Sequence, residues 1–302
     1  MDGKTLLYQV RQLLEEDSGS SFLDDFLTYQ FINEAAVEFC RRTLALTATQ
    51  TITTVADQEE YTLNADYMGL YLKNNSNRFY LKYSDGTNTY FINWKPYEEV
   101  VYQNNEDSVS IPDRFTIIDK STLADQLTGS ATSDGTATGG ACTLTDTAAD
   151  FSDVAAGDIV HNTTDVSDGV VLSVTSTTAL VTALFNGTND YWTSADAYVI
   201  QPQGRYQLIF DPAPSTADHT ATLYYIQRPA PVYSSYGAFR FQSHSTPALT
   251  RYAAWLYKYR DKDPNFGDKW YQFFEDMIRK SSNQIDHIKR RKNFRVSLKG
   301  RR

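Results

Sequence analysis

The chain has 302 residues, which is enough for two domains of ordinary size, each able to bury a hydrophobic core. Its 41% hydrophobic and 22% charged residues exclude a disordered chain, and a formal net charge of −9 argues against a general nucleic-acid binder. No apolar run approaches the roughly 20 residues of a membrane-spanning helix, and no signal peptide precedes the first amphipathic pattern. We therefore expect a protein without a membrane segment that is made in the cytoplasm.

Two helices are predicted at the start of the chain. Leu6 and Val10 lie on one apolar stripe of a helix over residues 5–16. A second helix over residues 21–46, with Ser21 as its N-cap, carries a broad apolar face.

The next segment changes to the period-two pattern of strands. Residues 51–55 and 60–63 alternate around a short polar loop, which predicts a hairpin. Strands over residues 78–83 and 90–94 flank an Asp-Gly turn, and a short helix follows over residues 95–102.

A different composition marks the middle of the chain. Between Lys120 and Arg205 there is no lysine, arginine or glutamate, although all three are frequent on either side. The flanking residues 114–119 and 205–210 both alternate like the strands of one hairpin. We therefore predict a small β domain, residues 120–204, inserted into the turn of that hairpin.

The predicted insert is all-β. Its short β-rich runs are separated by Gly, Asp and Asn turn clusters, and a five-stranded barrel or compact sandwich would leave few open edges. The runs are residues 141–145, 158–162, 170–174, 179–184 and 197–200.

Beyond the insert the first domain resumes. Residues 206–210 and 221–226 predict a second hairpin, and helices follow over residues 247–261 and 266–291. The predicted fold class is thus α+β: a bundle of the N- and C-terminal helices plus an antiparallel β-sheet, with the all-β domain inserted. The host domain comprises residues 1–119 and 205–288, the insert residues 120–204, and a basic tail residues 289–302.

Four segments and the aromatic C-terminal helices carry a resemblance to a known family. The segments are Asn33-Glu-Ala-Ala-Val-Glu-Phe-Cys-Arg-Arg42, Glu60-Tyr-Thr-Leu-Asn-Ala-Asp66, Leu208-Ile-Phe-Asp-Pro-Ala-Pro214 and Leu223-Tyr-Tyr-Ile226. Over residues 3–119 and 205–290 the chain resembles the head-to-tail adaptor, or head-completion, proteins of tailed bacteriophages. Residues 150–165 look like a small β module of various phage structural proteins, although the adaptors usually lack an insert of this size.

The resemblance implies an architectural function. Such adaptors form closed rings, commonly homododecamers, between portal and tail, and they line the channel through which double-stranded DNA passes. We therefore expect a virion protein of the neck or tail region, made in the host bacterial cytoplasm. The implied partners are further copies of this chain, the portal protein, and tail nozzle, tube or fibre proteins. Aromatic residues of the helices are candidates for the ring interface, with the core of one subunit as the alternative: Phe22, Phe26, Tyr29, Trp270, Phe273 and Phe274.

The basic tail has three interpretations. It is a solvated terminus, a segment that docks into an acidic groove of the portal, or a direct DNA contact. In the resembled family the C-terminal segment often extends toward the portal. The residues concerned are Lys289, Arg290, Arg291, Lys292, Arg295, Lys299, Arg301 and Arg302.

The insert offers two further hypotheses. Asp146, Asp150, Asp153 and Asp158 lack the spacing of a helical-hand calcium loop, so we expect turn and cap residues rather than a cation site. A phage surface or decoration protein that binds glycans is the alternative function, and it would use the aromatic side chains of the insert. These are Tyr191, Trp192 and Tyr198, for which a place in the core is the simpler expectation.

Catalysis has no support in the sequence. The four histidines show no metal-ligand spacing, and there is no nucleophile elbow, phosphate-cradling glycine loop or dinucleotide fingerprint. We therefore expect no enzyme, with no catalytic, cofactor-binding or metal site.

Overall fold

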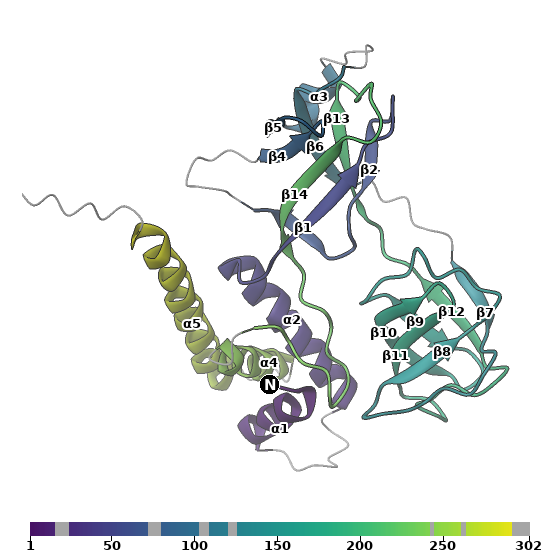
Figure 1. The fold of residues 1–302 in the computed structure, drawn as a ribbon. Helices are drawn as coiled ribbons and strands as arrows, with labels where there is room; N and C mark the ends of the chain where they lie inside the picture. Colours follow the sequence, from purple (N-terminus) through teal and green to yellow (C-terminus); the bar gives the residue numbers. More distant parts are fainter. Residues whose placement is uncertain are drawn as a thin grey trace, which may run out of the picture. The chain divides into compact units, whose positions relative to one another are not determined.

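The computed structural model describes residues 1–15, 24–71, 80–102, 109–119, 126–241, 245–260 and 264–291. These residues form a mixed α+β chain in which strands predominate and five helices are present (Figure 1). The chain divides into two compact units. The helical unit comprises Met1, Thr5–Ala45 and Phe241–Arg302, and the sheet unit comprises Asp2–Lys4 and Leu46–Arg240.

The helices follow the apolar periodicity of the sequence. α1 (Gly3–Leu14) buries Leu6 and Val10, and α2 (Asp25–Thr43) buries its apolar stripe. The predicted cap at Ser21 is wrong, because the Asp24 side chain accepts the N–H of Phe26 and thereby caps α2. In the C-terminal part, α4 (Thr246–Arg260) packs against both α2 and α5 (Pro264–Arg291).

The first sheet of the sheet unit joins segments from both sides of the predicted insert. Among the described residues its strand order is β1-β14-β4-β5-β6-β13-β2, with β3 paired to β14, and all pairs are antiparallel except β5 with β6. The short helix α3 (Tyr97–Tyr102) follows β5. The strands are β1 (Thr47–Thr53), β2 (Glu60–Thr62), β3 (Tyr67–Leu70), β4 (Tyr80–Ser84), β5 (Thr89–Trp94), β6 (Arg114–Asp119), β13 (Tyr206–Asp211) and β14 (Thr220–Gln227).

Two of the predicted hairpins are wrong. β1 and β2 lie at opposite ends of the strand order, and β13 does not pair with β14. All seven residues of β1 pair with β14, which has eight residues. β2 has only three residues, so it could pair with less than half of β1. Alternation of apolar and polar side chains predicts that a segment is a strand, but it does not indicate which other strand pairs with it.

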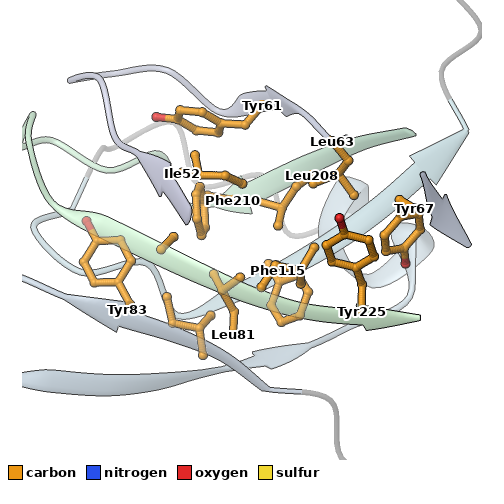
Figure 2. Close-up of a cluster of buried hydrophobic side chains, with 13 residues drawn as sticks. Ile52, Tyr61, Leu63, Tyr67, Leu81, Tyr83, Phe115, Leu208, Phe210 and Tyr225 are labelled. Atoms are coloured by element: carbon orange, nitrogen blue, oxygen red, sulfur yellow. The ribbon is translucent and has the colours of Figure 1, made fainter. Parts of the chain in front are cut away.

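The side chains of this sheet converge on one aromatic-rich core (Figure 2). Tyr61 packs edge-on against Phe210 with ring centroids 5.5 Å apart, and Tyr67 packs edge-on against Tyr206 at 5.1 Å. The predicted hairpins are thus replaced by two backbone ladders, β1 with β14 and β2 with β13, and the side chains of both ladders pack in this core.

The pairing of β6 with β13 brings the two ends of the predicted insert together. Tyr206 lies opposite Asp119 in this antiparallel ladder, as expected for the two strands of one hairpin. The residues between them include a second sheet with a core of its own, which contains Trp192, Tyr198 and Phe151.

This second sheet has six strands among the described residues, whereas we predicted five. Its order is β7-β12-β9-β10-β11-β8, and the missed strand β7 forms one edge. The backbone N–H of Thr132, just after β7, donates to the carbonyl of Thr145, the last residue of β8, at 2.7 Å. The two edge strands therefore come close at these ends. The strands are β7 (Leu127–Ser130), β8 (Cys142–Thr145), β9 (Ile159–Asn162), β10 (Ser167–Ser176), β11 (Ala179–Phe185) and β12 (Ala197–Gln201).

Candidate functional site

The predicted ring-interface residues differ in their exposure. Tyr29 and Phe274 are 4% and 0% exposed, because they lie on the inward stripes of α2 and α5. Their side chains therefore belong to the core of one subunit, which is the alternative that the sequence left open. Phe26, Trp270 and Phe273 are half-buried, and their interface role stays a prediction. Phe22 lies outside the described residues.

A row of aromatic side chains crosses the contact between α4 and α5. Tyr252, Trp255 and Tyr259 follow one another on α4, with ring centroids 5.2 Å and 5.8 Å apart. Trp255 also meets Tyr271 of α5 at 4.7 Å, and Tyr252 meets Phe274 at 4.5 Å. Because Tyr259 is exposed and Tyr252, Trp255 and Tyr271 are half-buried, this aromatic row continues from the core to the surface. This row was not predicted, although the spacing of three and four residues between the aromatic residues of α4 is visible in the sequence.

A charged group joins α2 to α5 beside the aromatic row. Arg42 donates two hydrogen bonds to Glu275, of which the bond from Nη2 to Oε2 measures 2.7 Å. The hydrogen bond from Arg42 lowers the pKa of Glu275, and the same pair raises the pKa of Arg42. Tyr271 is part of this group, since its hydrogen bond with Glu275 raises the pKa of the phenol. The pair thus links the side chains of α2 and α5.

An arginine of α4 covers an aromatic side chain of α5. The Arg251 guanidinium of α4 lies 3.9 Å from the ring centroid of Phe273 on α5. Burial lowers the pKa of Arg251. The half-buried face of Phe273 is thus partly occupied by a cation of its own subunit.

The basic tail is only partly described. Lys289, Arg290 and Arg291 lie in the last turn of α5, where positive charge complements the helix dipole. The side chains of these three residues lie outside the described part of the chain. So do Lys292, Arg295, Lys299, Arg301 and Arg302, and the portal-docking role stays a prediction.

The aromatic side chains named for glycan binding do not form a surface. Trp192 and Tyr198 are 0% and 2% exposed and pack edge-on in the core of the second sheet, 6.3 Å apart. Trp192 donates to Thr182 Oγ1 at 2.8 Å, and Tyr198 donates to Asp146 Oδ2 at 2.8 Å. The glycan hypothesis is wrong for these two residues, because a stacking platform needs an exposed ring; Tyr191 remains partly exposed.

The aspartates of the insert hold turns. Asp146 accepts the N–H of Ala148, and Asp150 accepts that of Ser152. Asp158 accepts the N–H groups of Ala155 and Gln203, and burial raises the pKa of its carboxyl group. At Asp153 the backbone carbonyl accepts a hydrogen bond from the Arg205 guanidinium at 2.6 Å. Over the described ranges, no group of three His, Cys, Asp or Glu side chains is placed to hold a metal ion.

One small cavity opens in the sheet unit, with a volume of about 120 Å³. Arg228 and Arg240 supply its charged groups. The lining residues are Leu46, Gln227, Arg228, Ala230, Ala238, Phe239 and Arg240. Among the described residues, this lining contains two arginines and no carboxylate or histidine.

Comparison with known proteins gives a family match for the N-terminal part of the chain. Residues 1–124 match the SU10 adaptor protein family. The adaptor match covers α1 to β6 and ends just after β6, near the start of the segment that lacks lysine and arginine. It supports a structural adaptor protein of the bacteriophage virion. A search of curated proteins found no match. No helix in the described part of this adaptor-like chain is long and apolar enough to cross a membrane.

Proposed function

We propose that this chain is a head-to-tail adaptor subunit whose copies form a ring, commonly of twelve, between the portal and the tail of a tailed phage. The ring extends the DNA channel, and its role is structural rather than catalytic. The observation that carries the proposal is the SU10 adaptor match over residues 1–124, which spans α1, α2 and the first six strands.

In this proposal the N- and C-terminal helices act together as a helical bundle that makes the subunit contacts. A closed ring needs two different complementary patches on each subunit. The aromatic row of α4 and α5 supplies one apolar patch, because Tyr259 and Trp255 extend it to the surface. Aromatic side chains of this kind are common at the centre of protein interfaces.

Electron microscopy of the purified protein, with and without portal, tests the proposal. We expect closed rings, alone or on the portal, with the channel running through them. A protein that stays monomeric and leaves purified portal unbound would contradict the adaptor function. Substitution of Tyr259 by Asp should weaken the ring. Tyr8→Asp is the matched control, because Tyr8 is an exposed tyrosine on α1, outside the aromatic row.

The basic tail docks on the portal in this proposal. Removal of residues 289–302 should weaken portal attachment, because the portal groove would lose its cationic partner. Unchanged affinity of the truncated protein for portal excludes docking by the tail. A DNA contact by the tail would instead show as weaker, less salt-dependent DNA binding after truncation.

The insert provides the attachment site for tail or fibre proteins. Because Tyr206 lies opposite Asp119, residues 120–205 can be replaced by a two-residue Asn-Gly turn while the hairpin of β6 and β13 is kept. The shortened subunit should still form rings but fail to recruit one tail component. If it recruits every tail component, the insert has a different role.

A further inference from the structure

The first sheet is almost closed, but one strand position is empty. β1 and β2 are the two ends of the strand order, and tracing the pairing from one to the other shows that they run in opposite directions. We call the gap between β1 and residues 60–64 the seam. Ile52, Tyr61 and Leu63 form the core beneath it (Figure 2).

Side chains, not backbone pairing, bridge the seam. Gln50 of β1 donates from Nε2 to the carbonyl of Thr62 at 3.1 Å, and its Oε1 accepts the N–H of Asn64 at 2.8 Å. The primary amide of Gln50 thus bonds the edge of β2 as a peptide group of a neighbouring strand would. At the other end, the Tyr61 hydroxyl bonds both the N–H and the carbonyl of Val55.

These contacts show that the two edges are too far apart for direct pairing. In a ladder the N–H and carbonyl groups of adjacent strands meet at about 2.9 Å, with strands roughly 4.8 Å apart. Here a complete glutamine or tyrosine side chain lies between one backbone and the other. The seam therefore has room for an extended backbone once Gln50 swings away.

The edge of β1 is suited to receive a strand. Backbone hydrogen bonds at Leu46 and Thr54 show that the even-numbered residues of this segment face β14. Because successive residues of a strand face opposite sides, the N–H and carbonyl groups of Thr49 and Thr51 point away from β14, toward the seam. Residues 47–53 contain no charge, proline or glycine, which are the features that usually protect an edge from pairing with another chain.

A sequence segment with a matching pattern occurs in the C-terminal tail, outside the described residues. Phe294-Arg-Val-Ser-Leu-Lys299 alternates strictly between apolar and polar residues, which predicts a strand with one buried face. Its apolar face matches the core beneath the seam. On the polar face, Arg295 and Lys299 complement the acidic start of β2, where Glu59 and Glu60 are exposed.

We infer that residues 294–299 of one subunit occupy the seam of a neighbouring copy, displace the Gln50 amide and complete the sheet. The added strand is antiparallel to one edge strand and parallel to the other. This inference rests on the proposed ring, and it assigns residues 294–299 to the neighbouring subunit, so the portal contact proposed for the basic tail would be made by Lys289, Arg290, Arg291 and Lys292. Each subunit carries one donor strand and one acceptor seam, which is the head-to-tail arrangement that a closed ring requires. In a single chain, Gln50 and Tyr61 keep the seam closed until a donor arrives.

Cysteine cross-linking of full-length protein tests the donor and the acceptor together. Ser297→Cys in one preparation is mixed with size-tagged Thr49→Cys, Thr51→Cys or Thr53→Cys in another, since the three positions cover the possible registers. Native Cys40 and Cys142 are buried and contribute little background. At least one mixture should give a disulfide-linked heterodimer, because cross-strand neighbours lie within disulfide range. No link above that of exposed Tyr8→Cys would overturn the inference. So would a link that forms only within one chain when Ser297→Cys and a threonine-to-cysteine change are combined in the same chain.

A matched pair of tail variants separates this inference from the ring itself. Val296→Asp puts a charge on the apolar face and should weaken assembly by about tenfold or more, whereas Ser297→Asp on the polar face should change it by less than about twofold. Sedimentation at several concentrations measures both. Wild-type protein that forms no ring contradicts the proposed function. Rings that form equally well with Val296→Asp contradict the strand exchange and leave the adaptor function standing.

Discussion

Arg114 and Asp211 lie directly opposite each other in β6 and β13, and Nε of the arginine donates to Oδ2 of the aspartate at 2.6 Å. Their side chains are only 15% and 6% exposed. The pair thus lies largely out of water on the two strands that lead into and out of the insert.

Removal of one member of this pair should be costly. Arg114→Met leaves the Asp211 carboxylate buried beside an apolar side chain, and we expect a loss of about 3 kcal/mol in the free energy of unfolding. Urea denaturation measures the loss. The double variant Arg114→Met with Asp211→Leu should recover much of it, because no unpaired charge remains. A double variant as unstable as the single one would show that the pair is not the cause.

The contact of α2 with α5 should depend on pH. Arg42 lowers the pKa of Glu275 below the ordinary value of 4.5, so the stabilisation is present above that value and is lost as the pH falls through the lower folded-state pKa. The pair is about one-third exposed, so we expect only about 0.5 kcal/mol. Wild type should exceed Glu275→Gln in stability at pH 7, and the difference should vanish in strong acid. Glu34→Gln, on the exposed side of α2, is the control.

The core of the insert should weaken without the Tyr198 hydroxyl. This group donates to the buried Asp146 carboxylate, so Tyr198→Phe should cost about 1–3 kcal/mol. Burial also raises the pKa of Tyr198. The associated stability is therefore complete below the ordinary phenol pKa and declines as the pH rises above it. Thermal unfolding of wild type should show a steeper alkaline decline than that of Tyr198→Phe; equal declines would contradict this assignment.

Gly139 should tolerate no side chain. Its φ is +61°, and an added Cβ would lie 2.4 Å from the Tyr236 ring, while its carbonyl accepts the N–H of Ser235 at 2.8 Å. Gly139→Ala should therefore destabilise the protein by about 1–2 kcal/mol, part of it from the backbone conformation. Adding Tyr236→Ala should remove the steric part. A Gly139→Ala protein as stable as wild type would show that this contact is loose.

Local patterns predicted the elements better than their partners. Residues 78–83 and 90–94 became the paired strands β4 and β5, because the Asp-Gly turn fixes a short connection. The partners of β1 and β2, which are β14 and β13, lie far away in sequence, and nothing local encodes that choice.

β7 shows a second reason for a miss. It contains one large apolar residue, Leu127, and Gly129, which usually weakens a strand. The glycine is required because a Cβ there would lie 2.5 Å from both the Tyr198 hydroxyl and the Asp146 carboxylate. The core of the second sheet also buries Trp192 and Tyr198. The sequence pattern alone does not show whether these two side chains are buried or exposed.

The position of Asp119 opposite Tyr206 has a mechanical consequence. A pull on the insert, for example by an attached fibre, acts on β6 and β13 in the same direction and does not peel them apart. The load passes instead sideways into the neighbouring ladders of β5 with β6 and β2 with β13, where bonds are sheared along the strands. Under tension the load would therefore act on these short flanking ladders, which have two residue pairs in β5 with β6 and three in β2 with β13.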